Sequence, residues 1–267
     1  MRNATDVRPL RVGVLIGHLS TTTANPEGTH LPIERQVDFL QSLLDPRYEL
    51  IALVEPETFD QPVVERTIRE YAVYGGLVDA TDRDALRTLD AIVVGWNFAV
   101  LPRVLRAIDE AVREGVGLYN HAQTAVWFPS PASPLVRNLL LADTYYGTYH
   151  TPGGHGLPMP ATVVNAHPSF PALRPGMTLD VWGCGPLYEP MPGATIVMQK
   201  GQPVCPEPGR DFGDPLAGPS CMPAVVAGCH GRGRVVAVNL CNVQPLQSLC
   251  GSPSHYLEGI LNWIAKT

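Results

Sequence analysis

Short aliphatic runs and amphipathic stretches alternate along the first half of the chain. Residues 11–16, 48–54, 91–94 and 116–119 are mainly apolar, and 11–16 and 91–94 are rich in β-branched side chains. Runs of this length and composition are typical of strands that are buried on both faces of a sheet. We therefore predict four buried strands before residue 120.

Between these runs, apolar residues recur at helical spacing. Ile33, Val37, Leu40 and Leu44 would share one face of a helix that begins near Pro32. Residues 61–70 are also predicted to be helical. Strands that alternate with helices at this spacing indicate βαβ units around a parallel sheet.

A third helix is predicted between the last two of the four strands. Its apolar face carries Leu101, Leu105, Ile108 and Val112, and Gly115 is placed to end it. On its polar side two pairs have the i, i+4 spacing of intrahelical ion pairs: Arg106 with Glu110, and Asp109 with Arg113.

The pattern changes after residue 143. Pro and Gly dominate 151–160 and 201–223. The short apolar runs of this half are 161–164, 195–198, 224–227 and 235–238. We interpret these runs as antiparallel or edge strands joined by long surface loops.

The last stretch of the chain predicts a closing helix. Ser252 suits the N-cap and Pro253 the first helical position. One face would pack on the sheet through Tyr256, Leu257, Ile260, Leu261 and Ile264.

Composition narrows the class of protein. The chain has 267 residues, of which 45 % are hydrophobic, and a net charge of −6 without a basic stripe. We expect one globular domain over 1–267 that binds no nucleic acid. No secretory h-region and no run of 18 uncharged apolar residues is visible, so we expect a cytoplasmic protein without a membrane partner. Reduced thiols are then expected for the six cysteines, with disulfides as the alternative.

Polar residues follow the carboxyl ends of the predicted strands. In open parallel sheets, ligands bind at these ends. The residues are Gly17-His18, Gly95-Trp96-Asn97, Tyr119-Asn120-His121, and Asn239 with Asn242. Two interpretations remain open: a shared pocket, or ordinary polar turns at strand ends. In a pocket, the carboxamides of Asn97, Asn120, Gln123 and Asn242 suit hydroxyl groups, and Trp96 or Tyr119 can stack on a sugar.

Segment 113–124, REGVGLYNHAQT, resembles the strand-to-helix turn on which class I glutamine amidotransferases carry their cysteine nucleophile. Asn120 or His121 occupies that turn here, and no cysteine lies near it. An amide cannot replace a thiolate, so the usual glutaminase reaction is not expected.

ThuA-like proteins of the same superfamily also lack this cysteine, and the chain resembles them. The partial matches, in the family's order, are Gly28-Thr29-His30, the 113–124 segment, His167-Pro168, Leu187-Tyr188-Glu189 and Gly231-Arg232-Gly233-Arg234-Val235. One departure is Leu240-Cys241-Asn242, where the family usually has Gly-His.

The resemblance implies a flavodoxin-like three-layer α/β sandwich with a mainly parallel sheet, extra strands and long loops in the C-terminal half. It also implies a carbohydrate-linked activity related to trehalose or keto-sugar metabolism. The expected catalytic residues are His121, His30 and Glu189. The expected substrate-binding residues are His18, Trp96, Asn97, Tyr119, Asn120, Gln123, His167, Tyr188 and Asn242.

His121 is the natural proton shuttle, with a structural or orienting role as the alternative. The first hypothesis is an acid/base hydrolase, lyase or isomerase that needs no cofactor, acts on a small carbohydrate-like substrate and forms a homo-oligomer. The second hypothesis is a non-catalytic ligand-binding or assembly module.

The third hypothesis is a metal-dependent hydrolase. His18, His30 and His121 would hold zinc, or Cys229, His230 and Cys241 would form a second set.

Overall fold

The computed structural model describes most of the predicted strands and a little over half of the chain. The described residues are 8–15, 46–54, 76–94, 102–121, 134–144, 158–182, 187–200, 222–238, 240 and 243–266. The predicted helices at 32–44 and 61–70 lie outside them.

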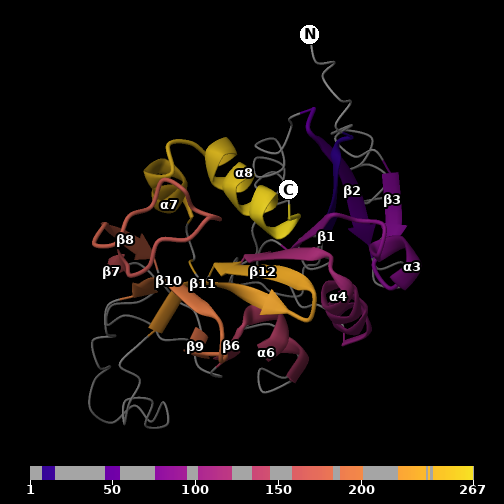
Figure 1. Ribbon diagram of the computed structural model, residues 1–267, viewed down its shortest axis with the longest axis horizontal. Coiled ribbons are helices and arrows are strands. Elements are labelled where there is room, and N and C mark those ends of the chain that lie inside the picture. Colours follow the sequence, from indigo (N-terminus) through magenta and orange to yellow (C-terminus); the bar gives the residue numbers. More distant parts are fainter. Residues whose placement is uncertain are drawn as a thin grey trace, which may run out of the picture.

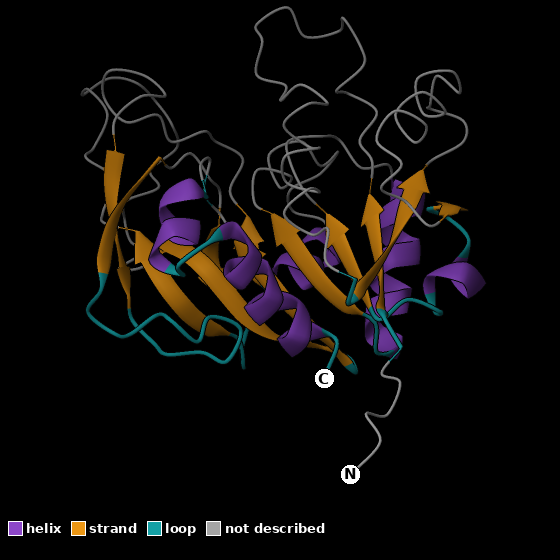
Figure 2. Cartoon of the chain, turned by 90° about the horizontal axis from the view of Figure 1, so that it is seen from above, coloured by secondary structure: helices purple, strands orange, loops and turns teal. Residues whose placement is uncertain are grey.

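Ten strands of the described residues form one sheet in the order β3-β2-β1-β4-β5-β12-β11-β10-β7-β8 (Figures 1 and 2). The first six are parallel: β1 (Leu10–Leu15), β2 (Tyr48–Val54), β3 (Gly76–Asp79), β4 (Ala91–Val94), β5 (Gly117–His121) and β12 (Gly233–Val238). Apart from the edge strand β3, this half has the flavodoxin order 2-1-3-4-5. The expected fold class is confirmed.

The other half of the sheet is antiparallel. Its strands are β7 (Pro158–Val163), β8 (Thr178–Trp182), β10 (Thr195–Lys200) and β11 (Met222–His230). A separate two-stranded sheet pairs β6 (Ala142–Thr144) with β9 (Leu187–Pro190). The prediction of antiparallel or edge strands holds for β7, β10 and β11. It holds in part for β12, a central strand that runs antiparallel to β11 and parallel to β5.

Helices cover both faces of this sheet, so the sheet is the middle layer of a three-layer sandwich (Figure 2). They are α3 (Arg83–Leu86), α4 (Pro102–Glu114), α6 (Pro134–Leu140), α7 (Gln244–Leu249) and α8 (Pro253–Ile264). One apolar core lies between the sheet and α7 and α8, and the other lies between the sheet and α3, α4 and α6. None of the helices in the described ranges combines the length and the apolar character needed to cross a bilayer.

Helix α8 forms as the sequence predicts. The hydroxyl of Ser252 accepts a hydrogen bond from the backbone N–H of His255, and Pro253 begins the helix. The five residues predicted to face the sheet are its buried residues. Burial of this face against β5 and β12 fixes the closing helix in place.

Helix α4 also forms, but its predicted ion pairs are wrong. Glu110 pairs with Arg83 of α3 at 2.7 Å, and Asp109 pairs with His230 of β11 at 2.7 Å. Asp109 is only 5 % exposed, because the β11–β12 hairpin covers this part of the helix. Helical spacing predicts which side chains share a face, and a neighbouring element can supply a better partner than the helix itself.

Gly117, the first residue of β5, lies against the end of α8. A Cβ at this position would be 2.6 Å from the carbonyl oxygen of Ile264, which is backbone and cannot rotate away. Gly76 in β3 serves as a control, because a Cβ added there would have no atom within 4 Å.

We predict that Gly117→Ala lowers the free energy of unfolding by about 2 kcal/mol, because α8 must shift away from β5. Gly76→Ala should change it by less than about 0.5 kcal/mol. Urea unfolding of both variants measures this difference. Equal stability of the two variants would show that the α8–β5 contact is looser than described.

Candidate functional site

The order of the parallel strands creates one place where neighbouring connections diverge. The chain starts in the middle of the sheet at β1, continues outward to β2 and β3, and then returns to β4 on the other side of β1. In open α/β sheets, ligands bind at the carboxyl ends of the strands beside such a reversal. The switch point of this sheet therefore lies at the ends of β1 and β4.

The parallel strands end together at what we call the carboxyl edge, and they begin together at the amino edge. The arrowheads of these strands point to the carboxyl edge in Figure 2. β1 ends at Leu15, β4 at Val94, β5 at His121 and β12 at Val238. Every segment that follows one of these strands thus starts from the same edge.

Six predicted site residues follow these strand ends and lie outside the described residues: His18, His30, Trp96, Asn97, Gln123 and Asn242. The backbone of His121, Tyr188 and Glu189 is described, but their side chains are not. His121 ends β5 and pairs with Val238 of β12. Tyr188 and Glu189 belong to β9, in the small sheet. The roles of these nine side chains stay predictions.

Asn120 is a buried amide one residue before the end of β5. It is 1 % exposed and pairs with Val94 of β4 and Ala237 of β12, both of which belong to the core on the α4 side. Directly paired residues point to the same face of a sheet. Its amide therefore lies below the carboxyl edge, at the point where β4, β5 and β12 meet, and it has a partner in the folded chain.

Tyr119 does not present its ring to a ligand, which corrects the prediction that it could stack on a sugar. Its side chain is 0 % exposed. Its hydroxyl lies 2.8 Å from that of Tyr256 on α8, and the two rings meet edge to face. Burial raises the pKa of both hydroxyls, so both stay protonated, and one of them donates a hydrogen bond to the other. This pair joins β5 to α8 in the core.

His167 lies at the wrong edge of the sheet for the predicted pocket. β7 runs opposite to β10 and to the parallel strands, so the chain leaves Val163 at the amino edge. The His167 ring lies edge-on to Trp263, near the end of α8, with ring centroids 4.6 Å apart. The expectation that His167 binds the same substrate as His121 is therefore wrong.

His167 has a structural role in its turn. Its Nδ1 accepts a hydrogen bond from the backbone N–H of Ser169 at 3.2 Å and lies 2.7 Å from the Ser169 hydroxyl. Nδ1 must therefore be unprotonated, and burial lowers the pKa of the ring. Ser169 itself is 0 % exposed.

Lys200 is a buried lysine that the sequence pattern did not reveal. It ends β10 at the carboxyl edge, is 3 % exposed and has an interaction partner in the folded chain. Three strand spacings separate β10 from β5, which amounts to about 14 Å. Lys200 therefore lies three strands away from His121 and farther still from the switch point at β1 and β4. The short apolar run at 195–198 predicted the strand but gave no sign that the following lysine is buried.

The described part of the chain contains no assembled metal-binding site. No group of three or more His, Cys, Asp or Glu residues there could hold an ion. Cys229 and His230 are adjacent in β11, so their side chains point to opposite faces, and His230 bonds to Asp109. Cys229 and Cys250 are free thiols. Cys241 and the set of His18, His30 and His121 lie outside this test.

Among the comparisons with known proteins, only the comparison with solved structures gave matches. No protein-family model and no curated protein matches it. A protein of Bacteroides uniformis described as ThuA-like aligns with 98 % of this chain and 94 % of its own, at 12 % identity and a TM-score of 0.58. A Parabacteroides merdae protein described as ThuA-like covers 97 % and 90 %, at 14 % identity and a TM-score of 0.57.

A third similar structure carries a different description. A Thermoplasma acidophilum protein described as part of a GMP synthase aligns with 97 % of this chain and 96 % of its own, at 9 % identity and a TM-score of 0.52. At these identities the comparisons show the fold. The expected resemblance to ThuA-like proteins and to the glutamine amidotransferase-like fold is confirmed at that level.

We predict that His167→Gln removes part of the pH dependence of stability. Because the pKa of His167 is lowered in the folded state, unfolded chains bind protons more readily, and stability falls as the pH drops below about 6.5. The wild type should lose more stability than the variant between about pH 7 and 5. Urea unfolding across this range measures the difference.

His255→Gln, which replaces an exposed histidine on α8, is the control for the loss of one histidine. A full wild-type slope in His167→Gln would contradict the role given to this ring.

Proposed function

We propose that this chain is a ThuA-like enzyme that acts on a sugar or keto-sugar derivative by acid/base chemistry, as a hydrolase, lyase or isomerase without a cysteine nucleophile. The observation that carries the proposal is the strand order. β1, β4, β5 and β12 end at one edge, around the reversal between β1 and β4. The residues that follow these ends are rich in imidazole and carboxamide groups.

His121 is the proposed acid/base. Its position at the end of β5, one strand away from the switch point, supports this role. The reference pKa of histidine near 6.5 suits proton transfer at neutral pH. His30 and Glu189 are proposed to assist His121 in catalysis. The protein is also proposed to be cytoplasmic and to form a homo-oligomer.

Recognition of the substrate is proposed to rest on amides and one indole. Asn97 and Asn242 would bind hydroxyl groups, and Trp96 would stack on the sugar face in place of the buried Tyr119. The buried Asn120 supports this proposal, because a fully buried amide at a strand end is expensive unless it is held by hydrogen bonds. It would stabilise the floor of the pocket below the substrate.

A non-catalytic ligand-binding module is the second candidate. The observations that favour it are the end of β5, which reads Tyr-Asn-His with no cysteine, and the burial of Tyr119, which removes one predicted ligand contact. A thermal-shift screen with sugars, keto-sugars and divalent metals, combined with product analysis, separates the candidates. A ligand that stabilises the protein and is never consumed would favour the binding module.

We predict that His121→Gln lowers turnover of the substrate found in that screen at least about 100-fold, the usual loss when a general acid/base is removed. Its free energy of unfolding should change by less than about 0.5 kcal/mol, because the side chain of a catalytic residue contributes little to the core. His167→Gln, at the opposite edge of the sheet, should keep wild-type turnover. Steady-state kinetics with and without a chelator measures all three proteins.

Wild-type turnover by His121→Gln would remove this residue from the mechanism. Loss of activity in the chelated wild type would instead support a metal-dependent hydrolase.

A further inference from the structure

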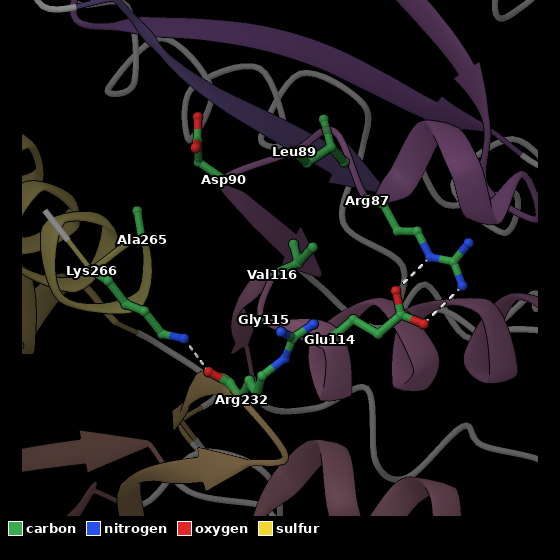
Figure 3. Close-up of a pocket in the computed structure, with 9 residues that line it drawn as sticks. All are labelled: Arg87, Leu89, Asp90, Glu114, Gly115, Val116, Arg232, Ala265 and Lys266. Atoms are coloured by element: carbon green, nitrogen blue, oxygen red, sulfur yellow. Dashed lines mark hydrogen bonds and ion pairs between the residues drawn. The ribbon is translucent and has the colours of Figure 1, made fainter.

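A cavity of about 490 Å³ lies at the amino edge of the sheet, whereas the proposed catalytic site lies at the carboxyl edge. It is formed where four connections meet: the loop after α3, the turn from α4 to β5, the β11–β12 hairpin and the end of α8 (Figure 3). Its charged lining residues are Arg87, Asp90, Glu114, Arg232 and Lys266.

Both carboxylates of the cavity are already neutralised. Glu114 binds Arg87 through two hydrogen bonds, which lower the pKa of its carboxyl group, and the charge of Arg232 lowers it further (Figure 3). Asp90 accepts two bonds of 2.7 Å from Arg8 and one of 2.8 Å from the backbone N–H of Arg11. Burial opposes ionisation of Asp90, but these bonds outweigh it and its pKa is lowered.

The other two cations have no such partner among the residues that the structure describes. Lys266 donates a hydrogen bond to the backbone carbonyl of Arg232, an uncharged group (Figure 3). The guanidinium of Arg232 makes no hydrogen bond to the described residues, and its charge lowers the pKa of Glu114, whose carboxylate Arg87 already holds. Two positive charges therefore face one cavity in a chain whose net charge is −6.

Gly115 lines the cavity beside Arg232 and Lys266. Its φ is +124°, and a Cβ there would be 3.8 Å from the Cβ of Arg232 and 3.9 Å from the Nζ of Lys266. A side chain at this position would extend into the cavity beside the stem of Arg232 and the ammonium group of Lys266.

We propose that this cavity binds a phosphate group, as a phosphomonoester or as the free ion, through Arg232 and Lys266. A guanidinium presents two parallel N–H donors that fit two oxygens of a phosphate, and an ammonium group can bind the third. The volume falls within the range of small-molecule sites and exceeds what a phosphate ion alone would fill. This site is independent of the proposed catalytic function and lies at the other edge of the sheet.

The test is a thermal-shift titration of the full chain with inorganic phosphate at about pH 8, where phosphate is a dianion, with KCl added to hold the ionic strength constant. The melting temperature of the wild type should rise and saturate. Arg232→Gln should raise the apparent Kd about tenfold or more, because it removes a charged donor pair. Since the side chain of Arg232 makes no hydrogen bond to described residues, the circular dichroism spectrum of the variant should match that of the wild type.

Arg174→Gln is the matched control, because Arg174 is exposed and its loss removes the same charge. Its guanidinium donates hydrogen bonds only to the backbone carbonyls of Pro171 and Leu173 among the described residues. Arg174→Gln should leave the apparent Kd unchanged. Glucose 6-phosphate and glucose are titrated in parallel, to distinguish a phosphate group carried by a small molecule from the free phosphate ion. Tighter binding of the sugar phosphate identifies a phosphomonoester site, and equal or weaker binding identifies a site for the free ion.

The absence of saturation with either phosphate compound in the wild type would overturn the proposal. So would an apparent Kd that is equal in the wild type and Arg232→Gln.

Discussion

Parallel pairing of β1, β4, β5 and β12 is the constraint on which the rest of the structure depends. Parallel neighbours cannot be joined by a tight turn, so the chain must leave each strand at one edge and re-enter the sheet at the other. Every segment that follows a parallel strand therefore starts at the carboxyl edge. In this chain those segments carry histidine, asparagine and tryptophan, whereas the strands are aliphatic.

The two faces of β5 show how the core supports this arrangement. On one face, Tyr119 lies against Tyr256 of α8, and Gly117 lets the end of α8 approach the backbone closely. On the other face, Leu118 packs with α4, and Asn120 is buried between Val94 and Ala237. A rigid strand with helices fixed on both sides gives the backbone of His121 a defined position, as a catalytic residue requires.

Much of the fold could be predicted from the sequence, because its long elements have complete patterns. β2 has the predicted bounds, and α8 has the predicted cap and the predicted buried face. β3, α3 and α7 have only four to six residues, too few to display a period. The site was harder to predict. His167 follows the motif order of the ThuA-like family, but order along the chain does not reveal that β7 runs antiparallel and leaves this histidine at the amino edge.

The central claim is that separate strand ends of one sheet deliver imidazole and carboxamide groups into a single cavity. A crystal structure of the full chain, solved with a ligand found by the thermal-shift screen, tests it most directly. The account predicts that His18, Asn97 and His121 face one cavity above the ends of β1, β4 and β5 and that the ligand contacts at least two of them. Side chains that point into separate solvent regions, with the ligand elsewhere, would contradict it.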